Sequence, residues 1–315
     1  MSWLTRNKRH PGWLALQLHE DRIDLVHCKP GSDGRPQIAL CDSFKKEGSP
    51  TSTLSRLCKE FKLNRYRCTT LLPVERYQLR EIDAPPVPEA EVKAAVRWRM
   101  KEMIDYPLES AIIEVLNIPP DPAGAGASTA LYAITARNDD VQACAGVFDS
   151  ARLSLDAIDI PELAQRNLAA LFEPDNQGVA MLAFYDNDGM LTFTRGGELY
   201  VSRRIELPLD QLMDGDLVRR TEHFARIALE VQRSLDHFER QYRYVSLSKL
   251  LLGPLPQDIG MHEYLASNID GDVEPIDLAT VMDVSLIPDL ERPERQSQYL
   301  SAIGAALRNG QDASA

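Results

Sequence analysis

The residues of this sequence that could do chemistry begin with a carboxylate-rich turn. Residues 186–189 read Asp-Asn-Asp-Gly, like the start of a calcium-binding loop. Such a loop needs flanking helices and a bidentate glutamate at its twelfth position. Here the turn joins two alternating apolar runs, and the glutamate is missing. We therefore expect a hairpin turn and no metal.

Two further candidates are a glycine-rich run and a pair of histidines. The Gly-Ala-Gly-Ala run at residues 124–127 lacks the Lys-Ser/Thr and the following helix of a phosphate-binding loop, which indicates a linker. His223 and His237 stand about four turns apart on an expected helix, too far to share a metal ion. We interpret both as ordinary surface or boundary histidines.

Five cysteines complete the candidates: Cys28, Cys41, Cys58, Cys68 and Cys144. Their odd number and irregular spacing argue against a disulfide framework and structural zinc, and indicate a reducing compartment. Apolar neighbours make Cys28 and Cys144 typical core cysteines, and no nucleophile-elbow pattern is present. Because no catalytic constellation is found, we expect no enzyme activity and no cofactor.

Charge limits the partners. Lys+Arg 35 against Asp+Glu 47 gives a net charge of -12. This charge repels nucleic acid and an anionic membrane leaflet unless a local basic patch intervenes. The basic N-terminal segment has no apolar run behind it, and no stretch approaches the ~20 apolar residues of a membrane span. We expect a cytoplasmic protein that binds no nucleic acid and meets the membrane only through a partner.

The elements that must position any site show a repeat. Alternating apolar runs predict three strands and a helix at residues 12–18, 23–28, 36–41 and 53–61, and again at 179–185, 190–194, 199–205 and 217–242. Such a repeat indicates a duplicated fold. Helices at 89–104, 139–151 and 161–172 alternate with strands at 110–118, 128–136 and 155–159. This alternation is typical of the α/β class.

Three stretches resemble type IV pilus biogenesis proteins of the PilM class: residues 95–108 (AVRWRMKEMIDYPL), 228–236 (ALEVQRSLD) and 302–308 (AIGAALR). The short MshI members of mannose-sensitive haemagglutinin (MSHA) pilus systems are more similar still, and the cytoplasmic domain of the type II secretion protein GspL is a second match. The resemblance implies an actin-like (ribonuclease H-like) α/β fold of two lobes. The lobes would be residues 1–175, with an inserted subdomain at about 85–136, and residues 176–315.

The resemblance also implies a partner. PilM relatives dock on the cytoplasmic N-terminal tail of a single-span, PilN-like inner-membrane protein and link it to the assembly ATPases. The matching subdomain borders the peptide site, which implies contacts at Arg97, Met100, Lys101, Ile104, Tyr106 and Pro107. An extended peptide there would add main-chain hydrogen bonds to a sheet edge. The alternative is an ordinary solvated helix, with Ala95, Trp98 and Met103 facing inward and Arg97, Arg99, Lys101 and Glu102 in solvent.

Actin-like proteins grip nucleotide phosphates with two turns that need glycine and aspartate. In PilM relatives the first turn has the sequence Asp-Ile-Gly-Ser, with a lysine five residues beyond the glycine. The second turn has the sequence Asp-Ile-Gly-Ala. The matching positions here are Gln17, His19 and Asp24 in the first turn, Ala183 and Tyr185 in the second, and Gly253 alone in place of the adenosine Gly-Gly pair. The resemblance therefore implies degenerate nucleotide loops.

Three functions follow from these observations. The first is a non-catalytic adaptor in MSHA-type pilus assembly, held peripherally at the inner membrane by its partner's tail, with the assembly ATPase as a further candidate partner. The second is an ATP-binding switch whose nucleotide state regulates pilus or type II secretion assembly. The third, a sugar- or acetate-kinase-like enzyme, lacks a phosphate grip and a candidate base.

Overall fold

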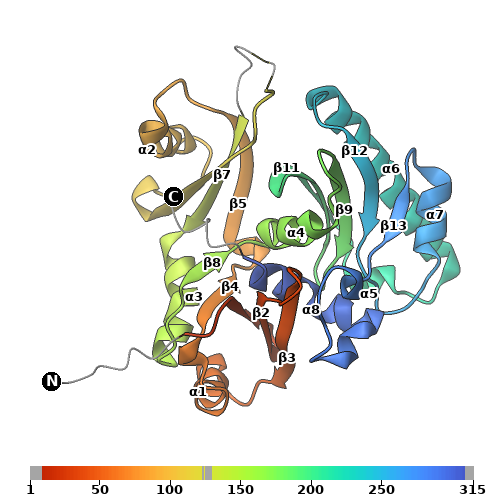
Figure 1. Cartoon of the computed structure of the whole chain (residues 1–315). Helices are drawn as coiled ribbons and strands as arrows, with labels where there is room; N and C mark the ends of the chain where they lie inside the picture. The colour runs from red at the N-terminus through yellow and green to blue at the C-terminus, as the bar shows by residue number, and fades with distance from the viewer. Residues whose placement is uncertain (1–8, 123, 125–129, 309–315) are drawn as a thin grey trace. The chain divides into compact units, whose positions relative to one another are not determined.

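Two meanders of three strands, each followed by a helix, organise the chain in the computed structural model, which describes residues 9–122, 124 and 130–308. The first comprises β1 (Trp13–Leu18), β2 (Arg22–Pro30), β3 (Pro36–Lys45) and α1 (Pro50–Glu60). The second comprises β9 (Gly178–Phe184), β10 (Gly189–Arg195), β11 (Glu198–Ile205) and α6 (Leu217–Gln241). The predicted repeat is confirmed (Figure 1).

The strand order of the two five-stranded sheets repeats as well. One sheet runs β3-β2-β1-β4-β8 and the other β11-β10-β9-β12-β13, where β4 is Arg67–Leu71, β8 is Ala157–Asp159, β12 is Leu247–Leu252 and β13 is Val273–Pro275. β9, β10 and β11 pair antiparallel, whereas β12 pairs parallel with both β9 and β13. β4 and β8 also pair parallel. This matched order is the topology of a duplicated α/β fold.

The chain forms two compact units. One comprises Gln17–Ile23 and Phe44–Pro161 with the described part of Met1–His10, and the other comprises Pro11–Leu16, Asp24–Ser43 and the described part of Glu162–Ala315. The first unit also holds the sheet β5-β7-β6, built from β5 (Tyr77–Asp83), β6 (Ala111–Asn117) and β7 (Ala130–Arg137), with α2 (Glu89–Met100) and α3 (Asn138–Ser150). The second unit also holds α4 (Pro161–Ala169) except for its first residue, α5 (Leu209–Leu212), α7 (Met261–Asn268) and α8 (Pro293–Ala306).

Helix starts follow local chemistry. The Ser49 hydroxyl accepts a hydrogen bond from the Ser52 amide, 3.1 Å away, at the start of α1. The Asp216 carboxylate accepts from the amides of Val218 and Arg219, at 2.9 and 3.3 Å, at the start of α6. Each cap satisfies amides that have no partner inside the helix. No helix in the described part of the chain is both long and apolar enough to span a bilayer.

The expected inward orientation is confirmed for Met103, which packs half-buried against the sheet, but it is wrong for Trp98. Trp98 is 69% exposed, whereas Val96 and Met100 are fully buried against the sheet cluster of Ile82, Ile113 and Leu131. Because Val96 and Met100 are four residues apart, they share a helix face, and Trp98, midway between them, points the opposite way. Helix α2 also ends earlier than expected, at Met100. In the turn that follows, the Met100 carbonyl accepts hydrogen bonds from the amides of Met103 and Ile104.

Other differences concern elements that are short or were not predicted, among them β4, β5, α7 and β13. The expected helix at 161–172 ends as a 3-10 turn, Ala170–Phe172, and the expected strand at 155–159 is reduced to β8. α5 and α8 were not expected from periodicity, since one is a single turn and the other is buried on nearly all sides. Part of the expected linker and the first residues of the expected strand at 128–136 lie outside the described residues.

Candidate functional site

The turn between β9 and β10 corresponds to the second expected phosphate turn and is a closed hairpin. The Tyr185 amide donates to the Asp188 carbonyl over 2.8 Å, which confirms the predicted hairpin turn at residues 186–189. Gly189 leaves room for the Phe184 ring, since an added Cβ would lie 2.7 Å from it. The turn is thus packed by its own side chains.

The Tyr185 side chain is fixed to α4. Its hydroxyl donates to Oε1 of Gln165 over 2.7 Å. The buried Gln165 amide nitrogen in turn lies 2.8 Å from the Met181 carbonyl, 3.1 Å from the Met190 carbonyl and 3.0 Å from the Thr192 hydroxyl. Burial, together with the charges of Asp188 and Glu162, raises the pKa of Tyr185 far above its usual value. Tyr185 therefore stays neutral and acts as a structural donor.

Two carboxylates near this turn form ion pairs with the same arginine. Arg204 of β11 lies 2.6 Å from Oε1 of Glu162, which is almost fully buried, and 2.9 Å from Oδ2 of Asp188. A guanidinium between two carboxylates forms charge-assisted hydrogen bonds with both. Among the described residues, no three His, Cys, Asp or Glu side chains are grouped to hold a metal. An ion-pair network therefore stands at the position of the second expected phosphate turn.

Gly253, which stands in place of the adenosine Gly-Gly pair, directly follows β12. Its amide donates to the Leu182 carbonyl over 2.7 Å, and an added Cβ would lie 2.9 Å from that of Ala183. Ala183 is itself fully buried. These two small residues serve the packing of β12 on β9.

The first turn, between β1 and β2, is closed by its own backbone. The His19 amide donates to the Arg22 carbonyl over 2.9 Å, and Lys46 donates to the Asp21 carbonyl over 2.8 Å. Gln17 and His19 are half-buried. This turn belongs to the first unit, whereas Asp24 belongs to the second.

Asp24, at the expected lysine position, is fully buried. Burial, with a smaller contribution from Asp24, raises the pKa of Cys41 well above its usual value. Burial, the Cys41 thiol and Asp24 likewise raise the pKa of Tyr299 to about 12, against the opposing charge of Arg295. Asp24 therefore belongs to a cluster of buried polar side chains with Cys41 and Tyr299. It offers no positive charge to a phosphate at the expected lysine position.

All five cysteines are free thiols, and Cys28, one of the expected core cysteines, is buried. Burial raises the pKa of Cys28 and of Cys68 to about 12, and it also raises the pKa of Cys58 and Cys144. A thiol with a raised pKa is a poor nucleophile at neutral pH, because the thiolate is the reactive form.

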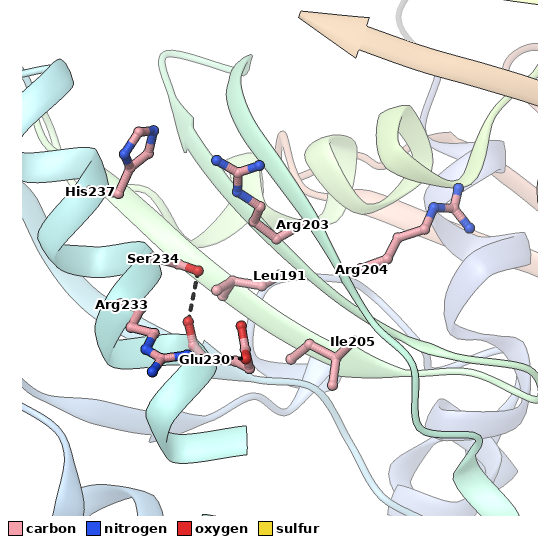
Figure 2. Close-up of a pocket in the computed structure, with 8 residues that line it drawn as sticks. All are labelled: Leu191, Arg203, Arg204, Ile205, Glu230, Arg233, Ser234 and His237. Carbon is pink, nitrogen blue, oxygen red and sulfur yellow. Dashed lines mark hydrogen bonds and ion pairs between the residues drawn. The ribbon is translucent and has the colours of Figure 1, made fainter. Parts of the chain in front are cut away.

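A hollow of about 300 Å³ lies where β10 and β11 meet α6. Figure 2 shows Arg203 and His237 at this hollow, while the neighbouring Arg204 points to the other face of β11. Glu230 and Arg233 form an ion pair of 3.8 Å on the helix side. Sequence reasoning did not find this hollow, since its residues come from three separate elements, β10, β11 and α6. The sequence offers one signal, the alternation of side chains along β11, which places Arg203 and Arg204 on opposite faces of the strand.

The expected partner-binding residues all lie on α2 and the segment after it. Met100 is buried in the core, and Ile104 and Tyr106 pack half-buried against the same cluster. Arg97 donates to the carbonyls of Leu108 and Ala111, over 2.6 and 3.1 Å.

Only some of the expected partner-binding residues are accessible to a partner. Lys101 and Pro107 are exposed, and the Lys101 ammonium lies 6.0 Å from the exposed Trp98 ring. The Arg137 guanidinium covers the Tyr106 ring at 4.3 Å. We define the α2 surface as Trp98, Lys101 and Pro107. Arg97, Ile104 and Tyr106 shape this surface, and Met100 supports it from below.

The arrangement of strands and helices is similar to that of a known protein structure. No protein-family model matches the sequence, and no curated protein does. A chain in the structure of a PilM-PilN type IV pilus biogenesis complex is similar over 94% of this chain and 98% of that chain, with a TM-score of 0.73 and 19% identity. The fold is actin-like. The expected α/β class is thereby confirmed.

Two further solved structures have lower scores. The cytoplasmic domain of EpsL, an inner-membrane component of the type II secretion system of Vibrio cholerae, is 13% identical, with 88% of this chain and 93% of that chain covered and a TM-score of 0.46. A Bacteroides thetaiotaomicron protein with an actin-like ATPase fold is 11% identical, with 92% and 98% covered and a TM-score of 0.47.

Proposed function

We propose that this protein is a non-catalytic cytoplasmic adaptor in type IV pilus assembly, of the MSHA type, that binds the cytoplasmic tail of a single-span, PilN-like inner-membrane protein. The observation that carries the proposal is the end-to-end likeness to a chain of the PilM-PilN complex, with a TM-score of 0.73. The proposal includes a division into two lobes, residues 1–175 and 176–315. It also includes an assembly ATPase as a second partner.

The second turn supports binding over turnover. A nucleotide phosphate approaches backbone amides closely only where glycine leaves room. Tyr185 and Gln165 are bonded to each other at 2.7 Å instead, and Arg204 joins Glu162 and Asp188. These side chains give the turn a structural role that needs no ligand.

We place the tail on the α2 surface. An exposed tryptophan beside a lysine offers a large apolar face and a positive charge, a combination typical of binding hot spots. β6 and β5 are the outer strands of the three-stranded sheet, so an extended peptide has a strand edge to pair with. Arg97 holds the segment that leads into β6 through the Leu108 and Ala111 carbonyls.

The test is a titration of the full chain with the synthetic cytoplasmic tail of the single-span protein encoded beside it, with and without Mg-ATP. We expect micromolar or tighter binding, about -8 kcal/mol, unaffected by ATP. Trp98→Ala should weaken binding about tenfold, since a lost hot spot costs more than ~1 kcal/mol. Leu229→Ala is the matched control, because Leu229 is an exposed apolar residue of α6.

The outcomes separate the proposals. Absence of tail binding overturns the adaptor, and binding that requires Mg-ATP favours the nucleotide switch. Equal affinity of wild type and Trp98→Ala leaves the adaptor standing and refutes the α2 surface as its site.

A further inference from the structure

A second hollow, of about 700 Å³, lies in the first unit between the C-terminal ends of α1 and α3. Four cationic side chains line it: Lys59, Lys62, Arg65 and Arg152. All four are exposed, and none forms an ion pair within the described part of the chain. Among the described residues, no carboxylate lines the hollow. On a protein with a net charge of -12, this is a local reversal of charge.

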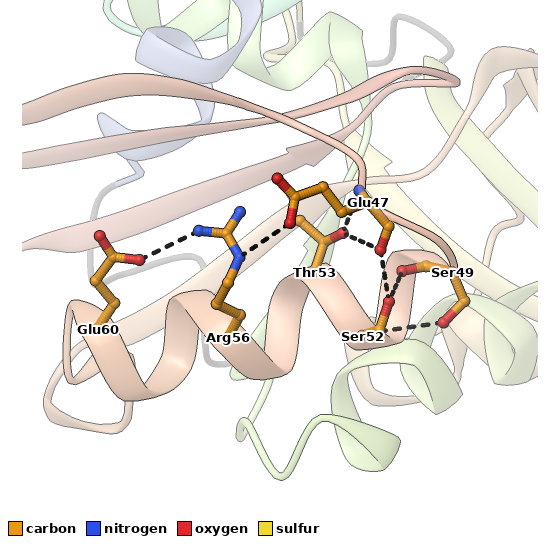
Figure 3. A network of polar contacts seen from close by, with 6 residues as sticks. All are labelled: Glu47, Ser49, Ser52, Thr53, Arg56 and Glu60. Carbon is orange, nitrogen blue, oxygen red and sulfur yellow. Dashed lines mark hydrogen bonds and ion pairs between the residues drawn. The ribbon is translucent and has the colours of Figure 1, made fainter.

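Glu60, the single carboxylate of α1, and Glu47, which precedes the helix, are engaged elsewhere. Figure 3 shows Arg56 between Glu47 and Glu60, at 3.9 and 3.3 Å. This chain of charges follows the Arg56 and Glu60 side of the helix. Glu60 is therefore held by Arg56, although Lys59 stands next to it in sequence.

Helix dipoles account for only part of this positive charge. A helix C-terminus carries about -0.5 charge, so two of them attract about one positive charge between them. The hollow supplies four cations. A surplus of about three charges remains for a ligand.

The backbone at two of the cations adds a second observation. Lys62 and Arg152 have φ angles of 54° and 58°, the left-handed conformation that favours glycine after a helix end. A side chain there costs roughly 1 kcal/mol relative to glycine. Both helices thus end in a cation where the backbone favours glycine, and both cations face the same hollow.

The lining chemistry indicates the class of ligand. Asn64, Ser55 and Ser150 add neutral hydrogen-bonding groups, and the described lining residues include no aromatic ring to stack on a base. Lysine and arginine with such donors suit the several oxygens of a phosphate group. We propose that this hollow binds the phosphate of an anionic ligand, either a lipid headgroup or a soluble phosphate. The proposal is independent of the tail-binding function.

The structure supplies variants that remove charge without endangering the fold. Lys62→Gly and Arg152→Gly delete two cations and relieve the left-handed backbone, so the double variant should be folded and at least as stable as wild type. Asn176→Gly is the matched control, because Asn176 is the remaining described non-glycine residue with positive φ, at 62°, and lies outside the hollow.

The experiment has two arms with the full chain at low salt. One measures co-sedimentation with phosphatidylglycerol-containing vesicles against pure phosphatidylcholine vesicles, and the other titrates inorganic pyrophosphate by calorimetry. We expect binding in at least one arm, weakened by salt, reduced at least tenfold in the double variant and unchanged in Asn176→Gly. Binding to the vesicles alone identifies a headgroup, and binding to pyrophosphate alone identifies a soluble ligand.

Three results would overturn the proposal. These are no binding in either arm, equal binding by wild type and the double variant, and displacement of the phosphate ligand by polyglutamate at equal charge concentration. The last result would assign the hollow to an acidic protein segment instead.

Discussion

At the scale of single residues, the second turn is held by hydrogen bonds that a pattern search cannot find. Gln165 comes from α4, and its amide contacts three groups on β9 and β10 besides Tyr185. A buried amide is stabilising only when its hydrogen bonds are made, so the four contacts depend on one another. The substitution at Tyr185 therefore serves the fold.

Replacement of Tyr185 by Phe tests this role. The variant leaves Oε1 of Gln165 without the hydroxyl that donates to it, and we expect a loss of about 1–3 kcal/mol in the free energy of unfolding. Urea denaturation followed by circular dichroism measures it. Tyr264→Phe is the control, because no hydrogen bond of the Tyr264 hydroxyl is found among the described residues. Equal losses in both variants would contradict the interpretation.

At the scale of elements, α4 and α8 pack closely because of a glycine. A Cβ at Gly304 would lie 2.3 Å from the Ala164 carbonyl oxygen. Asn167 of α4 donates to the Gly304 carbonyl over 3.0 Å, which fixes the same contact. The sequence stretch 302–308 that carries part of the family resemblance thus has a packing reason.

Gly304→Ala should force the two helices apart. We expect a destabilisation of about 1–3 kcal/mol, typical of overpacking, as a lower denaturant midpoint with little change in slope. Gly215→Ala serves as control, since an added Cβ there meets nothing within 4 Å and φ is not positive. A Gly304→Ala variant as stable as the control would show that α4 and α8 yield without strain.

At the scale of the whole molecule, the question is whether the duplicated fold still binds nucleotide. A ligand that binds only the native state at a hundred times its Kd raises stability by about 2.7 kcal/mol. We expect Mg-ATP to leave the unfolding midpoint of the Lys62→Gly, Arg152→Gly double variant unchanged.

The double variant matters for this measurement because ATP also carries phosphate. A shift in wild type that disappears in the double variant belongs to the cationic hollow. A shift that persists in the double variant would restore the nucleotide switch.

The sequence by itself determined the α/β class, the two meanders and most strand positions. Alternation of apolar residues with period two, and turns such as Asp-Gly and Gly-Gly, are local properties that each segment carries alone. The resemblance added the actin-like fold, which the structure shares with the PilM-PilN complex chain.

Only the tertiary structure decided which face of α2 is buried and which charges meet. Apolar residues occur on more than one side of that helix, so the sheet selected Val96 and Met100 and left Trp98 in solvent. The cationic hollow joins residues 59–65 to Arg152. Such groupings depend on long-range packing, which no local pattern records.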